Sequence, residues 1–289
     1  MSGILFDLYI NDLPSCLNFM QISMYADDAK LFSPVDDKNS EKSVQEDLDS
    51  LSRWCQQWRL RLNAAKCFLV HYRPQKCERD FPKYSIDGRQ LPRKTCASDL
   101  GIIISDNLKF HEQVTNACKK ANRETGIIRR SFLSRNPKFL SNMFKSHVRP
   151  HLEHCVQVWN PVYAGDSQSM EKVQNRLSKL LRHGSVMTPE ERNKCLDITD
   201  HKSRRLRGDL IHIYKMYDDE RLFRKSQECR TRGHTRKLML ELTHNNIRQH
   251  SFSYRATSLW NGLPNDIVVA NSLYCFKSKI DYYIKNNVV

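Results

Sequence analysis

The chain has 289 residues, of which 39% are hydrophobic and 27% charged, a composition typical of a folded protein with room for a sizeable core. It contains no apolar run of about 18 residues that would span a membrane, and its N-terminus lacks the pattern of a secretory signal. The formal net charge of +15 favours a polyanionic partner, and we expect an intracellular protein that does not bind membranes.

Residues 4–13 predict the first helix. Leu5 and Leu8 follow helical spacing, and Pro14 limits the end of the helix. A first element that starts without a lead-in indicates that something upstream is absent.

Residues 22–32 predict a β-hairpin with Asp27 and Asp28 at its tip. Ile22 and Met24 alternate with their neighbours, as in a half-buried strand, and Asp is favoured in turns. Two adjacent carboxylates repel each other unless a cation lies between them, and such hard oxygen ligands suit Mg²⁺. The pair is therefore a candidate metal site, although most Asp-Asp turns are only solvated.

The strongest helical pattern ends at Leu62. Apolar residues recur there at steps of three and four in one continuous stripe: Val44, Leu48, Leu51, Cys55, Trp58 and Leu62. Asn39 or Ser40 can cap this helix, which we expect to face a core. A turn then leads to a strand over residues 68–72, so Lys66 lies at a helix–loop–strand junction, near the working end of the expected sheet.

Two further β segments follow. Asp87-Gly88 between extended pieces predicts a second hairpin. Residues 99–110 predict a β-branched strand, a turn and a short return.

Beyond Phe110 the pattern is mostly helical. We expect helices over residues 111–132, 138–148 and 151–159, with a break at Pro150, then a helix capped by Asp166, another that opens near Lys202 and a final one from about Ser272. Residues 224–237 are basic and are expected to form a loop.

The positive charge lies entirely in this second part. Residues 1–110 carry 15 Lys and Arg against 15 Asp and Glu, whereas residues 111–289 carry 32 against 17. A neutral, carboxylate-bearing part followed by a basic part suggests metal-assisted chemistry beside a polyanion-binding surface. About half of the basic side chains are expected to be only solvated. The candidates for nucleic-acid contacts are Lys119, Lys120, Arg123, Arg129, Arg130, Lys172, Arg176 and Lys179.

The ten cysteines are scattered singly. No Cys-x-x-Cys pair occurs, which argues against a zinc ribbon or a thioredoxin-type site. We expect reduced and mostly buried thiols. His151, His154 and Cys155 could begin a metal cluster, but they lack a fourth ligand at a recognisable spacing.

Several of these segments resemble motifs of the reverse transcriptases of non-LTR, Jockey-like retrotransposons. Tyr25-Ala26-Asp27-Asp28 resembles the catalytic motif, and the segments Gly3–Phe6 and Leu8–Pro14 resemble the end of the palm motif before it. Leu62–Cys67 is similar to the next motif, and Asp99-Leu100-Gly101-Ile102 to the primer grip. Residues 148–159 and 260–264 are similar to the C-terminal region of such elements.

The resemblance implies an α+β fold. We expect a truncated antiparallel palm sheet with packed helices over residues 1–110, a basic helical thumb over residues 111–184, and a C-terminal helical and loop region over residues 185–289. It also implies RNA-directed DNA polymerase activity with two Mg²⁺ ions. The implied partners are an RNA template and a DNA primer, or an RNA–DNA duplex.

The resemblance also implies a role for each candidate site residue. Asp27 would be the main metal ligand, and Asp28 would assist it. Lys66 would neutralise or protonate the leaving pyrophosphate. Leu100 and Gly101 would help to hold the primer end.

The sequence departs from the family pattern in one respect. The family carries another metal-binding Asp, on a strand before the first helix, and fingers that hold the template and the nucleotide; this chain begins after both. We therefore expect a truncated product that cannot polymerise alone, unless another chain completes it in trans. The alternatives are a non-catalytic nucleic-acid-binding remnant that acts through the thumb, and an unselected translation of a dead element.

Overall fold

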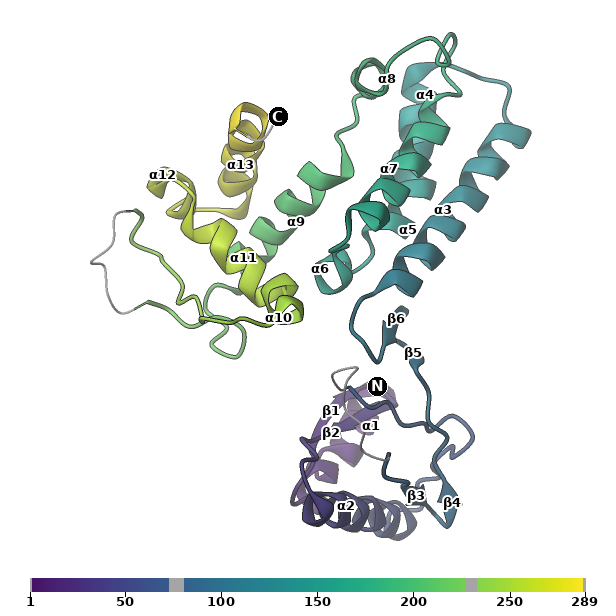
Figure 1. Ribbon diagram of the computed structural model, residues 1–289, viewed down its shortest axis with the longest axis vertical. Coiled ribbons are helices and arrows are strands. Elements are labelled where there is room, and N and C mark those ends of the chain that lie inside the picture. The colour runs from purple at the N-terminus through teal and green to yellow at the C-terminus, as the bar shows by residue number, and fades with distance from the viewer. Residues whose placement is uncertain (1, 73–80, 227–232, 288–289) are drawn as a thin grey trace. The chain divides into compact units, whose positions relative to one another are not determined.

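The computed structural model describes residues 2–72, 81–226 and 233–287, and the chain divides into two compact units, Met1–Ala97 and Ser98–Val289 (Figure 1). The described part is mostly helical and contains three two-stranded sheets, so the predicted α+β class is confirmed at this level. None of its helices is both long enough and apolar enough to cross a membrane. The three-part division at residues 110 and 184 stays a prediction.

The first unit is built around one long helix, α2 (Lys38–Gln57). Its other elements are α1 (Ser2–Ile10), the 3₁₀ helix η1 (Leu13–Cys16), β1 (Gln21–Tyr25), β2 (Asp28–Phe32), β3 (Ser85–Ile86) and β4 (Arg89–Gln90). Four residues of the apolar stripe, Val44, Leu48, Leu51 and Cys55, are buried together with Ile10, Leu13, Tyr84 and Ile86. The prediction that this helix faces a core is therefore confirmed.

Both ends of α2 differ from the prediction. The cap is Asp37, whose carboxylate accepts the backbone N–H of Ser40 at 2.7 Å, so Ser40 receives the cap and does not provide it. The helix ends at Gln57, which leaves Leu62 in the following loop and Trp58 40% exposed.

The β structure of this unit is shorter than expected. The Asp87-Gly88 hairpin is confirmed, with φ of 49° and 72°, the left-handed pair that a type I′ turn requires. The expected strand over residues 68–72 is reduced to one bridge between Leu69 and Arg93. Leu69 N–H donates to Pro92 O at 3.0 Å, and Leu69 O accepts the N–H of Lys94 at 2.9 Å. Pro92 has no N–H to donate to the next residue of the facing segment, so the ladder cannot extend on that side.

The second unit is mostly helical. The chain enters it within β5 (Cys96–Asp99), which pairs with β6 (Ile102–Ser105). Its helices are α3 (His111–Ser131), α4 (Pro137–Met143), the π-helix η2 (Phe144–Val148), α5 (Arg149–Glu153), α6 (Val156–Trp159), α7 (Ala164–Ser178), α8 (Pro189–Leu196), α9 (His201–Met216), α10 (Asn246–His250), α11 (Phe252–Asn261), α12 (Asn265–Val268) and α13 (Leu273–Asn287).

Two apolar clusters stabilise this unit. The first joins α3, η2, α5 and α7 and contains the fully buried Phe144, Trp159 and Leu177. The second joins α9, α11 and α13 around Trp260 and Phe276. The predicted return strand before α3 is absent, since residues 108–110 are irregular. Part of the predicted loop over residues 224–237 lies outside the described residues.

The predicted break at Pro150 is wrong. The helical path continues through Pro150, which is in the first turn of α5, and breaks instead at Cys155, where φ is 50°. Pro clashes with the carbonyl four residues earlier and removes one hydrogen bond. The wider π turn of η2 directly before α5 accommodates this loss, as π segments inside helices commonly do.

Asp166 does not cap α7. The N-cap position is Tyr163, and Asp166 lies in the first turn, where its side chain is buried. Its Oδ1 lies 2.7 Å from Nδ1 of His111, the first residue of α3. The carboxylate thus joins the starts of two packed helices, a tertiary role that the local sequence did not indicate.

Candidate functional site

The two carboxylates lie where the sequence predicts, at the turn of the β1–β2 hairpin. β1 and β2 pair antiparallel with Tyr25 opposite Asp28, so Ala26 and Asp27 form the two-residue turn and Asp28 opens β2. Both Asp side chains are exposed. Ala26 has a φ of 51°, a left-handed backbone that is uncommon for a residue with a Cβ and tends to occur at functional sites.

A buried carboxylate on α2 holds the segment that leads into this hairpin. Asp47 is 2% exposed, and its two oxygens accept the backbone N–H groups of Asn18, Phe19 and Met20 at 2.9, 2.8 and 2.6 Å. The sequence motifs do not include Asp47. Its signal in the sequence is an acidic residue directly beside Leu48, on the face of α2 that is otherwise apolar.

Lys66 lies in the same unit as the carboxylate pair. It follows α2 in an exposed turn, in which its backbone N–H donates to Asn63 O at 2.9 Å. Within the described residues no ion pair joins Lys66 to Asp27 or Asp28. Its role at the pyrophosphate stays a prediction.

The carboxylate pair by itself is a small donor set. In the described ranges, no group of three or more His, Cys, Asp or Glu side chains is placed to hold a metal ion. Two carboxylates fit Mg²⁺ when substrate phosphates supply the remaining oxygens. Asp27 and Asp28 can therefore contribute to a magnesium site but do not enclose one.

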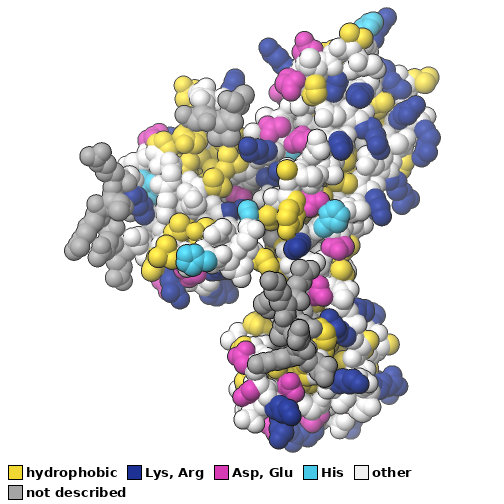
Figure 2. Space-filling view, viewed as in Figure 1, with side chains coloured by type: hydrophobic (Ala, Val, Ile, Leu, Met, Phe, Trp, Pro, Cys, Tyr) yellow, Lys and Arg dark blue, Asp and Glu magenta, His cyan; other side chains and the backbone are white. Residues whose placement is uncertain are grey.

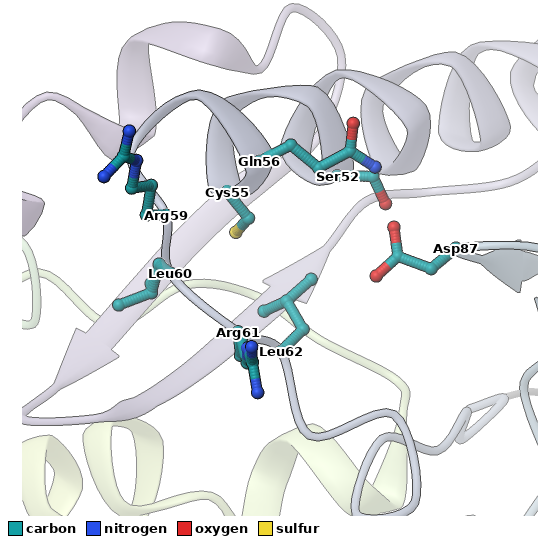
Figure 3. A pocket seen from close by; sticks show the side chains of 8 residues that line it. All are labelled: Ser52, Cys55, Gln56, Arg59, Leu60, Arg61, Leu62 and Asp87. Carbon is teal, nitrogen blue, oxygen red and sulfur yellow. The ribbon is translucent and has the colours of Figure 1, made fainter.

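A cavity of about 510 Å³ in the first unit involves none of the predicted site residues (Figure 3). It lies between the end of α2, the loop after it and the β3–β4 turn, with Asp87 facing Ser52 and Gln56. Cys55 points into it. Burial, with smaller contributions from Cys16 and Asp87, raises the pKa of the Cys55 thiol to about 11. The thiol is therefore protonated at neutral pH and cannot act as a nucleophile.

The predicted primer-grip residues form the turn between β5 and β6, in the second unit. Leu100 has a φ of 46° and Gly101 a φ of 82°, so both have the left-handed backbone of a type I′ turn. The Leu100 side chain is 53% exposed. The role of Leu100 and Gly101 at the primer end stays a prediction.

The basic candidates all have exposed side chains on two packed helices or at the end of one. Lys119, Lys120, Arg123, Arg129 and Arg130 lie on α3. Lys172 and Arg176 lie on α7, and Lys179 is the residue that directly follows it. A hydrogen bond of 3.0 Å from Arg176 to Asn122 joins the two helices. Figure 2 shows Lys and Arg side chains gathered along the edge of the second unit that α3 occupies in Figure 1.

The expectation of mostly buried thiols is wrong. Of the eight described cysteines, all of them free, only Cys55 and Cys118 are buried, whereas Cys155, Cys195 and Cys275 are exposed. The other two cysteines, Cys77 and Cys229, lie outside the described residues. The exposed cysteines lie in turns or on exposed helix faces. No periodic apolar pattern in the sequence distinguishes these positions from core positions.

The comparisons with known proteins agree with the sequence motifs. Residues 1–104 match the family described as reverse transcriptase (RNA-dependent DNA polymerase). The chain is 29% identical over 170 residues to the RNA-directed DNA polymerase from mobile element jockey of Drosophila melanogaster. The matched region covers 54% of this chain and 18% of that protein. It is 30% identical over 144 residues to the protein of the same name from Drosophila funebris, covering 48% of this chain and 15% of that protein. The match thus spans less than a fifth of each relative's length, and no solved structure matches the chain.

Proposed function

We propose, from the premise that this chain belongs to the Jockey-like non-LTR reverse transcriptases, that it supplies part of the catalytic site of an RNA-directed DNA polymerase. The observation that carries this proposal is the exposed Asp27-Asp28 pair at the β1–β2 turn, inside the segment that matches the family. Templated nucleotidyl transfer needs carboxylates that can reach both a metal ion and a phosphate, and an exposed hairpin turn permits that.

Each candidate site residue would have one role in the transfer. Asp27 and Asp28 would hold Mg²⁺, which when bound activates the primer hydroxyl and neutralises charge on the transferring phosphoryl group. Lys66 would neutralise or protonate the pyrophosphate. Leu100 and Gly101 would position the primer end.

This catalytic set is incomplete in the described residues. The two-metal mechanism uses two ions, and Asp27 and Asp28 alone would be a small donor set for both. No third acidic side chain lies near enough among the described residues to complete a site. We propose that a carboxylate from another polypeptide segment completes it in trans, and that the chain does not polymerise alone.

Primer extension on an RNA template with Mg²⁺ tests this function. The chain alone should give no extension, and mixing it with the preceding polymerase segment of a Jockey-like element should restore extension. Asp27→Asn should abolish the restored activity, whereas Asp49→Asn, at an exposed position of α2, should leave it unchanged. Robust extension by the chain alone would overturn the need for a partner, and restored activity that survives Asp27→Asn would overturn the assigned site.

A second function, nucleic-acid binding without catalysis, is favoured by the eight exposed basic side chains on α3, on α7 and at the C-terminal end of α7. Phosphate contacts release counterions, so binding of an RNA–DNA hybrid should weaken steeply as salt rises. The variant Lys172→Glu/Lys179→Glu should weaken binding and lower the salt dependence. Lys138→Glu, an exposed control on α4, should change both much less, and salt-independent binding would contradict this function.

A further inference from the structure

The turn that carries Gly101 opens onto a cavity of about 250 Å³ in the second unit. Three elements converge on it: the β5–β6 turn, α3 and α5. Its lining includes Gly101, Gln113, Asn116, Lys120, His151 and His154. Residues far apart in the sequence, two of which the motifs had suggested only as metal ligands, thus line one concave site.

The chemistry of this lining suits an anion. No carboxylate lines the cavity, and the polar side chains are one Lys, two His and two amides. Gln113 accepts the backbone N–H of Ile103 at 2.9 Å through its Oε1, which leaves its amide N–H₂ group as a donor. A metal cation would meet the positive charge of Lys120 and find no acidic ligand, so the lining favours a phosphate over a metal ion.

Two features make a glycine suitable at position 101, beside the cavity. Its φ of 82° is strained for any residue with a Cβ. A Cβ at this position would also lie 3.6 Å from Nε2 of His154, so a larger side chain would narrow the opening. The bare backbone of the turn can therefore approach a ligand beside His154.

We propose that this cavity binds a backbone phosphate of the nucleic acid, with Lys120, His151 and His154 as its cationic and hydrogen-bonding groups. The inference rests on the proposed function, because it assumes a nucleic-acid ligand. It goes further by assigning the two histidines and a specific pocket.

The test measures the affinity of the full chain for a short fluorescein-labelled RNA–DNA hybrid by fluorescence anisotropy. Lys120→Gln/His154→Gln should weaken binding about tenfold, since charge-assisted hydrogen bonds to a phosphate are lost. The logarithmic salt slope should fall by about one for the lost Lys. Asn116→Phe, which places a ring in the cavity and removes no charge, should also weaken binding, while circular dichroism checks that each variant is folded.

The matched control is Lys138→Gln/His147→Gln, which removes the same two residue types from exposed positions on α4 and η2. It should change the affinity less than twofold. If folded pocket variants bind the hybrid as tightly as the wild type does, the pocket assignment is overturned, although binding through α3 and α7 stands. A wild-type chain that binds no hybrid at all would overturn the proposed nucleic-acid function and this inference with it.

A second arm uses inorganic phosphate, followed by ³¹P NMR line broadening. The hybrid should compete with inorganic phosphate for the site, and the pocket variants should lose both ligands. Phosphate binding that the pocket variants abolish without any change in hybrid affinity would assign the cavity to a free anion and overturn the backbone assignment.

Discussion

The Asp47 carboxylate, buried in α2, accepts the backbone N–H of Phe19 at 2.8 Å. The same side chain accepts the N–H groups of Asn18 and Met20, the residues just before β1. One helix residue thereby orients the segment that enters the Asp27 hairpin. The two-stranded β1–β2 sheet has little burial of its own, so it depends on such anchors.

We predict that Asp47→Ala destabilises the first unit by about 3 kcal/mol, because three backbone donors lose a charged acceptor. Asp47→Asn should destabilise the unit less than Asp47→Ala, since the amide keeps one oxygen that can accept a hydrogen bond. Hydrogen exchange of the peptide over residues 18–32 gives the local readout, and urea unfolding gives the total. Asp49→Ala, at an exposed position of the same helix, should stay within about 0.5 kcal/mol of the wild type. Unchanged exchange over residues 18–32 in Asp47→Ala would contradict the anchoring role.

The left-handed backbone of Ala26 leads to a second prediction, on the stability of the β1–β2 hairpin. A Cβ in this conformation costs about 1 kcal/mol or more, whereas the added freedom of Gly in the unfolded chain offsets part of that. Ala26→Gly should therefore stabilise the hairpin by about 0.5 kcal/mol, and Ala26→Val should destabilise it by more than about 1 kcal/mol. Slower amide exchange over residues 21–32 in the Gly variant and faster exchange in the Val variant would match; the reverse order would exclude strain at this turn.

Features that depend on local sequence were predictable. The β1–β2 hairpin, the stripe of α2, the Asp87-Gly88 turn and helix α3 all follow from periodicity and turn preference, which act within a few residues. The position of Asp27 and Asp28 at a turn was predictable for the same reason.

Features that depend on distant partners were not predictable. The strand expected near Leu69 is limited to one bridge because Pro92, beside the bridge partner Arg93, has no N–H to extend the ladder. Asp166 contacts His111 from the first turn of α7 and does not cap that helix. The sequence marks Asp47 as an acidic residue on the apolar face of α2, but its hydrogen-bond partners are set only when the segment before β1 folds back onto that helix. The cavity beside Gly101 likewise needs α3 and α5 to meet the β5–β6 turn.

The ion pair between Arg255 and Asp209 gives a third prediction. Arg255 Nε lies 2.9 Å from Asp209 Oδ2, with both side chains largely buried, and Arg255 also donates to the carbonyls of Gln157 and His250. Burial raises the pKa of Asp209 above its ordinary value, although the hydrogen bonds from Arg255 oppose this. The carboxylate therefore depends on Arg255 to remain charged inside the protein.

Arg255→Met should destabilise the second unit by about 3 kcal/mol or more, because it leaves a buried carboxylate without its partner. The double variant Arg255→Met/Asp209→Leu should be more stable than Arg255→Met alone, with a coupling energy of about 2 kcal/mol in urea unfolding. The cost of Arg255→Met should also shrink as the pH falls, since Asp209 can then bind a proton. Additive effects of the two single changes would show that the pair contributes no specific stabilisation.

His201 makes stability depend on pH. It is 1% exposed at the start of α9, its ring centroid lies 6.3 Å from that of Phe144, and its Nε2 has no hydrogen-bond partner among the described residues. Burial is the main cause that lowers the pKa of His201 to about 4. Some nearby charged groups raise this pKa and others lower it further, but their effects are smaller. The folded protein therefore holds a neutral ring that the unfolded chain protonates below about pH 6.5.

The direction in which the free energy of unfolding changes with pH follows from proton binding in the two states. Between about pH 6.5 and pH 4 the unfolded state binds more protons at this position, so the free energy of unfolding falls as the pH falls through this window. Between pH 7 and pH 5 the wild type should lose about 2 kcal/mol more stability than His201→Phe, which keeps a ring without a titrating group. Burial raises the pKa of Glu171 and of Asp209, which stabilises the fold as the pH falls, but both groups are present in both proteins.

Urea unfolding at a series of pH values measures this difference directly. His147→Gln, at an exposed position of η2, is the matched control and should follow the wild-type profile. Parallel pH profiles for the wild type and His201→Phe would mean that the ring is not held neutral in the folded state. A steeper loss in the wild type alone would establish His201 as the group that makes the core of the second unit sensitive to acid.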